Sequence, residues 1–140
     1  MKDNNQGFSL VELVVVIAIM AALAGILAPS YLRYIEKTRI QKDESAAGEI
    51  YRAAEVAVYS GEYEIVGTVV LTFNSNGISF PNASAINTST AEEILKEHFG
   101  DQYQTIVPVS KKYRNRTYSV TLDPPAENSL IPIISGSWSS

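Results

Sequence analysis

Residues 7–29 read GFSLVELVVVIAIMAALAGILAP, and this stretch decides how the chain is organised. Every residue over 13–28 is apolar or glycine, and the run extends back toward its start with only Ser9 and Glu12 as polar interruptions. About twenty such residues suffice to cross a bilayer as an α-helix. We therefore expect a transmembrane helix over residues 8–30.

The order of segments differs from that of a cleavable secretory signal. Such a signal has a basic leader, a shorter apolar run and small residues such as Ala-x-Ala after it. Here residues 1–7 form a polar leader that holds only Lys2 and Asp3 as charged side chains. The one conspicuous junction, Gly7-Phe8, precedes the apolar run. Cleavage at that junction would leave the anchor on the chain.

Residues 7–13, GFSLVEL, followed by the apolar run, resemble the processing motif of type IV pilins and pseudopilins. Four features coincide: a polar leader ending in glycine, an aromatic residue after it, a glutamate one turn later, and an apolar helix ending near proline. The resemblance implies that a prepilin peptidase cleaves after Gly7 and that the amine of Phe8 is N-methylated. It also implies that the mature helices bundle into a homo-oligomeric filament.

The same resemblance implies a location. The precursor would be a single-pass protein of the cytoplasmic membrane with its N-terminus inside, and a membrane platform with its ATPase would assemble the mature chain into an extracellular pilus. Counting basic residues gives the opposite orientation, because four follow the span within residues 33–42 whereas the leader has only Lys2. The orientation therefore rests on the resemblance.

Glu12 is unusual because an ionised carboxylate costs about 3 kcal/mol at the middle of a membrane, and somewhat less near its edge. One interpretation places it in the headgroup zone, or at the positive end of its own helix, where it stabilises by about 0.3–1 kcal/mol. The interpretation that the resemblance favours pairs Glu12 with the freed Phe8 amine of a neighbouring subunit.

Pro29 removes the helical hydrogen bond to the carbonyl of Gly25, at a cost of about 3 kcal/mol. The helix is therefore expected to bend or melt there. Two interpretations stay open: a passive kink at the membrane boundary, or a weak point that loses helicity when subunits pack, as the resemblance implies.

An amphipathic continuation of the helix is predicted over residues 31–61, ending near Gly61. Charged residues, Asp43 and Glu44 among them, are assigned to its other faces. Its apolar positions are Ile35, Ile40, Ala47, Ile50, Ala54, Ala57 and Val58.

Residues 62–140 predict a small β-rich head, and thus an α+β fold in which the second half of the long helix packs on one antiparallel sheet. A turn is expected at 74–77 and a short helix over 89–100. Strands are expected at 68–73, 78–80, 105–109, 117–122 and 130–134. Because the chain has no cysteine, we expect the last strand to hold the C-terminal part by pairing into the sheet.

The head concentrates its basic residues around Tyr113, at an expected hairpin tip. We favour a role in docking against the acidic surface of the next head in a filament. The alternative is a site for DNA or an acidic polysaccharide, with Tyr113 and Tyr118 stacking on the ligand. The basic residues are Lys111, Lys112, Arg114 and Arg116.

Charge and side-chain chemistry exclude several other functions. A net charge of −4 argues against a general nucleic-acid binder. The single histidine, His98, has no recognisable nucleophile or metal-ligand spacing around it, so we predict no enzyme, cofactor or metal. Acidic residues Glu92, Glu93 and Glu97 are expected to complement the dipole of the short helix rather than bind a cation.

The sequence thus favours a structural subunit, a type IV pilin, of a pilus that serves adhesion, motility or aggregation. One alternative is a minor pilin or pseudopilin of a type II secretion or DNA-uptake machine. Another is a stand-alone membrane-anchored binding domain, which would not need Gly7 before Phe8 or Glu12 within the apolar run.

Overall fold

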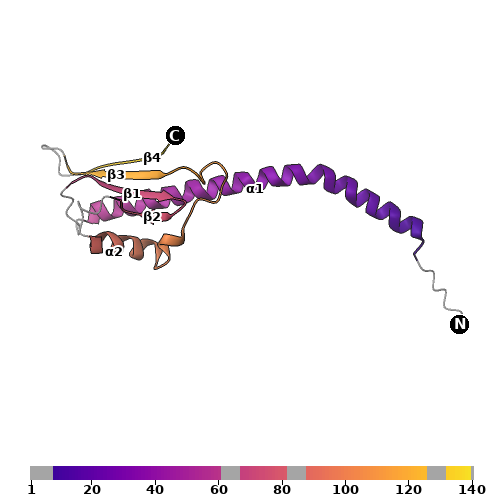
Figure 1. Ribbon diagram of the computed structural model, residues 1–140, viewed down its shortest axis with the longest axis horizontal. Helices are drawn as coiled ribbons and strands as arrows, with labels where there is room; N and C mark the ends of the chain where they lie inside the picture. Colours follow the sequence, from indigo (N-terminus) through magenta and orange to yellow (C-terminus); the bar gives the residue numbers. More distant parts are fainter. Residues whose placement is uncertain (1–7, 61–66, 82–87, 126–131, 140) are drawn as a thin grey trace. The chain divides into compact units, whose positions relative to one another are not determined.

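The computed structural model describes residues 8–60, 67–81, 88–125 and 132–139. Its longest element, α1 (Leu10–Ser60), is one continuous α-helix (Figure 1), as predicted. The chain divides into two compact units, residues 1–37 and 38–140.

The first unit consists of the apolar part of α1. This helix contains the one segment among the described residues that is long and apolar enough to cross a membrane, with a mean hydropathy of 2.8. Pro29 lies inside α1, which stays helical on both sides of it, so the expected melting is not seen in the single chain. The carbonyl of Pro29 accepts a hydrogen bond from Arg33 Nε at 3.4 Å.

The second unit is a head built on a four-stranded antiparallel sheet, in the order β2-β1-β3-β4. The turn between β1 and β2 follows the prediction: the side chain of Asn74 accepts the Asn76 N–H at 2.8 Å, and Gly77 takes a φ of +99° that favours glycine. The strands are β1 (Val69–Asn74), β2 (Gly77–Ser79), β3 (Tyr118–Asp123) and β4 (Ile133–Trp138).

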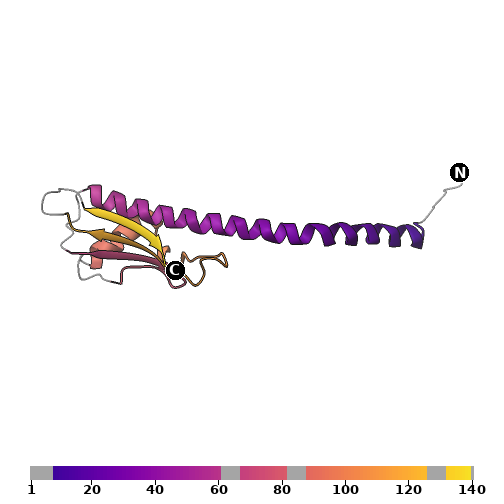
Figure 2. The same cartoon turned by 90° about the horizontal axis from the view of Figure 1, so that it is seen from above.

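The core of the head lies between this sheet and the C-terminal half of α1, which run side by side in Figures 1 and 2. Apolar residues at helical spacing on α1 meet alternate residues of the strands, which is how a helix and a sheet each bury one face. A second helix, α2 (Thr88–Phe99), adds Leu95, and the short helix η2 (Tyr103–Thr105) adds Tyr103. Core residues include Ile50, Ala54, Val58, Val69, Leu71, Phe73, Val120 and Leu122.

Two strand predictions need correction. The strand at 105–109 is wrong: η2 ends at Thr105 and residues 106–109 form no strand. Both edges of β3 are already paired, with β1 and β4, and Pro108 has no N–H to donate. The strand expected at 130–134 is β4, which lies further along at Ile133–Trp138 and pairs with β3 over its whole length. Residues 130 and 131 fall outside the described residues.

Candidate functional site

The start of α1 is built by Ser9 and Glu12. The Ser9 hydroxyl accepts the N–H of Val11 at 3.3 Å, and the Glu12 carboxylate accepts the N–H of Ser9 at 2.8 Å. This reciprocal arrangement is a capping box, which satisfies N–H groups that have no partner inside the helix. In the single chain Glu12 therefore stabilises the positive end of its own helix, as one interpretation of the sequence expected.

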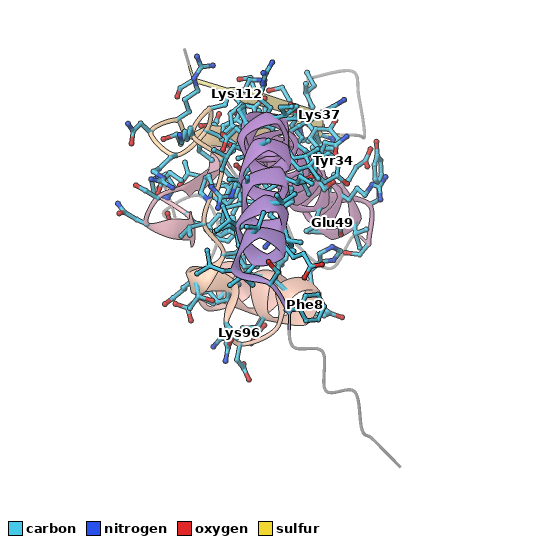
Figure 3. The ribbon with its side chains drawn as sticks, turned by 90° about the vertical axis from the view of Figure 1, so that its right-hand side faces the viewer. Phe8, Tyr34, Lys37, Glu49, Lys96 and Lys112 are labelled. Carbon is cyan, nitrogen blue, oxygen red and sulfur yellow. The ribbon has the colours of Figure 1, made fainter. Side chains whose placement is uncertain are left out.

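Phe8 precedes this cap and is 90% exposed (Figure 3), whereas Gly7 lies outside the described residues. The large apolar side chains that follow Phe8, as far as Tyr34, are between 47% and 78% exposed. An apolar surface of this extent is stable only when lipid or other protein covers it. The Gly25 and Pro29 segment lies within this surface.

A second candidate site is the anchored loop, residues 109–116, which Asp43 fixes to α1. Asp43 is buried, and its two carboxylate oxygens accept the N–H groups of Val109 at 2.9 Å and Ser110 at 2.8 Å. Such charge-assisted bonds are roughly twice as strong as neutral ones. The hydroxyl of Ser110 in turn accepts the Tyr113 N–H at 3.3 Å, which shapes the turn that follows.

Tyr113 holds the middle of the anchored loop. Its hydroxyl donates to Glu44 of α1 at 2.8 Å, and its ring stacks on Trp138 of β4 with centroids 4.1 Å apart. Lys112 Nζ lies 4.5 Å from the centre of the same ring and 3.6 Å from the Glu44 carboxylate. The Tyr113 side chain, and with it Glu44, raises the pKa of Lys112.

The predicted basic patch is therefore not a hairpin tip, because strand 105–109 does not exist and the loop is anchored on α1. Tyr113 is buried and is not available to stack on a ligand. Tyr118 is half-buried in β3, with its ring 5.3 Å from that of Trp138, and this burial raises its pKa.

The four basic side chains of the loop have different surroundings. Lys112 turns toward Glu44, while Lys111 and Arg116 are exposed. Arg114 faces an open groove of about 660 Å³ that α1 also lines. Its walls are Arg39, Lys42, Ser75, Val107, Pro108, Val109 and Arg114, three cations and no carboxylate.

Sequence reasoning missed Asp43 and Trp138. Asp43 was assigned to a solvent face, yet it lies four residues before Ala47 and seven before Ile50, which places it on the buried face of α1. A single acid on an apolar face signals a buried hydrogen-bonding partner. Trp138 carried no such signal, because its partner Tyr113 comes from a loop 25 positions earlier.

The remaining candidates behave as surface residues. His98 is an exposed residue of α2, as expected, with Nε2 3.9 Å from a Glu49 oxygen of α1. Glu92 pairs with Lys96 one turn later at 3.8 Å. Across the described ranges, no group of three or more His, Cys, Asp or Glu side chains is placed to hold a metal ion.

Comparison with known proteins points to the same end of the chain. The family model described as the prokaryotic N-terminal methylation motif matches residues 2–28. No solved structure matches significantly.

Three relatives extend the similarity beyond that motif. The type IV major fimbrial protein FimA of Dichelobacter nodosus is 37% identical over 62 residues, 44% of this chain and 40% of that protein. A fimbrial protein of Pseudomonas aeruginosa is 32% identical over 89 residues, 64% of this chain and 57% of that protein. The prepilin peptidase-dependent protein A of Clostridium perfringens is 29% identical over 119 residues, 79% of this chain and 84% of that protein.

The chain thus spans about half the length of the two fimbrial proteins. Two of the three relatives are named as fimbrial proteins, and the third is named as dependent on prepilin peptidase. The chain carries the N-terminal methylation motif of the type IV prepilins and is homologous to type IV fimbrial pilins.

Proposed function

We propose that this protein is a type IV pilin, a structural subunit that is anchored in the membrane by α1 and then assembled into a surface filament. One observation carries the proposal most directly. The methylation motif at residues 2–28 coincides with a half-helix whose large apolar side chains are exposed. This apolar surface of α1 is used in the membrane and in the filament, because lipid covers it before assembly and neighbouring helices cover it afterwards.

Processing is assigned to the Gly7-Phe8 junction. A prepilin peptidase cleaves after Gly7, and the new amine of Phe8 is N-methylated. Supporting this, the Clostridium relative is named for its dependence on prepilin peptidase. Residues 1–7 are then the leader, 8–30 the transmembrane and assembly segment, 31–61 its amphipathic continuation and 62–140 the head.

Glu12 is assigned to assembly. Its carboxylate points at the helix start, where it binds the Ser9 N–H at 2.8 Å. Cleavage adds a positive amine at Phe8, next to that N–H. Inside a bundle of apolar helices an ionised carboxylate needs a counter-charge, and the Phe8 amine of a neighbouring subunit supplies one.

The precursor is accordingly a cytoplasmic-membrane protein with its N-terminus inside, and the mature chain is part of an extracellular pilus. The partners are further copies of the chain, the prepilin peptidase, and the assembly platform with its ATPase.

Intact-mass measurement tests the processing step. Co-expression with a prepilin peptidase should yield a membrane-bound chain that starts at Phe8, carries one added methyl group and keeps the apolar helix. A Gly7→Leu variant serves as the matched control and should stay at precursor mass. A mature chain that starts beyond Ala28 would identify a secretory signal and overturn the proposal.

A further inference from the structure

Basic residues from two distant segments of the chain meet at one groove of the head. Of the eleven lysines and arginines, four lie within residues 111–116, and Arg39 and Lys42 lie on the part of α1 that belongs to the head. Asp43 fixes the anchored loop to α1, and the groove beside it takes Arg39 and Lys42 from the helix and Arg114 from the loop. All three side chains are exposed.

The groove has a chemical character of its own. Its apolar lining comes from Val107, Pro108 and Val109, and Val107 is 38% exposed. Cations therefore surround a small apolar surface, a combination that suits an acidic protein segment with apolar stems. Within the described part of the chain, the side chains of Lys42 and Arg114 make no hydrogen bond or ion pair.

A complementary surface lies elsewhere in the head, on α2. Glu93 and Glu97 are exposed and one helical turn apart, so their like charges lie side by side and destabilise the helix. Neither carboxylate makes a hydrogen bond or ion pair with another described residue, whereas Glu92 pairs with Lys96. The other acids near the loop are engaged, since Glu44 binds Tyr113 and Lys112.

We propose that the cationic groove of one copy docks the Glu93 and Glu97 face of α2 of a second copy. The inference rests on the proposed function and names a head-to-head contact within the filament. Because the two surfaces are different patches of the same molecule, the contact is heterologous. A heterologous contact that does not close into a ring repeats indefinitely and builds an open helical filament.

Charge reversal tests the contact in full-length chains, expressed with the assembly machinery in cells that lack the native subunit. The groove variant is Lys42→Glu with Arg114→Glu, and the α2 variant is Glu93→Lys with Glu97→Lys. Each should lower the sheared filament fraction by about tenfold or more, because like charges then face each other. Combining all four changes should bring filaments back to within about threefold of wild type, since the pairing is restored with reversed sign.

A matched control keeps the charge change but moves it off the groove: Lys111→Glu with Arg116→Glu lies on the same loop and should leave filaments unchanged. The amount of mature chain in the membrane fraction, which should stay constant, shows that each variant is made and processed.

Three results would overturn the inference. One is a normal filament yield from both reversed variants when wild type assembles, which leaves the proposed function intact. Another is a filament yield that stays low in the variant with all four changes, while its membrane fraction is normal. The third is groove-reversed filaments that form normally but no longer retain DNA at low salt, which would assign the groove to an anionic polymer. Absence of filaments from wild type would instead refute the proposed function.

Discussion

A buried carboxylate, Asp43, ties α1 to backbone 66 residues further along the chain. The protein has no cysteine, so this part of the head is held without a covalent cross-link. Two charge-assisted hydrogen bonds from Asp43 hold it instead, and Tyr113 of the same loop stacks on Trp138 of β4. Fixing residues 109 and 110 to α1 closes a long loop, and the entropy cost of such a closure grows only slowly with loop length.

We predict that Asp43→Ala destabilises the head by about 3 kcal/mol, because it leaves one buried and one part-buried N–H group without an acceptor. The single tryptophan, Trp138, reports the change: its fluorescence in detergent-solubilised full-length chain should give an earlier urea midpoint. Glu44→Gln is the control, with an expected loss of less than about 1 kcal/mol since Glu44 is half exposed. Equal midpoints for the two variants would show that Asp43 is not the anchor.

Single residues were also where sequence reasoning was least complete. The motif residues Gly7, Phe8 and Glu12 can be recognised in the sequence because the motif is defined by residues that are close together along the chain. The roles of Asp43 and Tyr113 depend on contacts with segments far away in sequence, which residue type alone does not reveal. The same limit explains why the alternative that stacked Tyr113 on a ligand fails: Tyr113 packs inside the head.

At the scale of elements, the structure follows the local signals closely. Three features were predictable: the apolar periodicity of α1, the turn at 74–77, and the end of α2 at Phe99, which Gly100 follows with a φ of +77°. Strand 105–109 failed because β4, and not this segment, pairs with the edge of β3 that β1 leaves free, and because Pro108 has no N–H to donate. The sequence of residues 105–109 does not indicate which segment pairs with β3.

The Gly25 to Pro29 segment of α1 is helical here, and we propose that it is nevertheless the weak point of the helix. Pro29→Ala should restore the hydrogen bond to Gly25, adding up to about 3 kcal/mol of local helix stability, and slow amide exchange over residues 25–29 in detergent. Gly25→Ala, whose added methyl group meets nothing within 4 Å, changes helix propensity alone and should slow exchange less. Equal exchange in the wild type and the proline variant would rule out a weak point.

At the scale of the whole molecule, each unit exposes surface that further copies of the chain can cover. The first unit exposes apolar side chains along α1, and the head exposes cations beside the anchored loop and carboxylates on α2. A soluble monomer would gain nothing from either feature. Repeated association of copies satisfies both, which is why we regard assembly as the function that the sequence and the fold jointly support.

The central claim is that Glu12 supplies the counter-charge for a neighbouring Phe8 amine, and three substitutions separate this from its capping role. Glu12→Leu removes charge and cap, Glu12→Gln keeps an acceptor for the Ser9 N–H but loses the charge, and Ser9→Ala weakens the cap alone. Insertion into the membrane should be intact or improved for both Glu12 variants, because a costly group leaves the hydrocarbon.

The decisive measurement is the sheared filament fraction relative to the membrane fraction, in cells that lack the native subunit. Both Glu12 variants should lose most of their filaments, because breaking one half of a buried ion pair costs about 3–5 kcal/mol, while Ser9→Ala should assemble nearly normally. A normal filament yield from Glu12→Leu or Glu12→Gln would show that the carboxylate only caps its own helix, and would contradict the pairing mechanism.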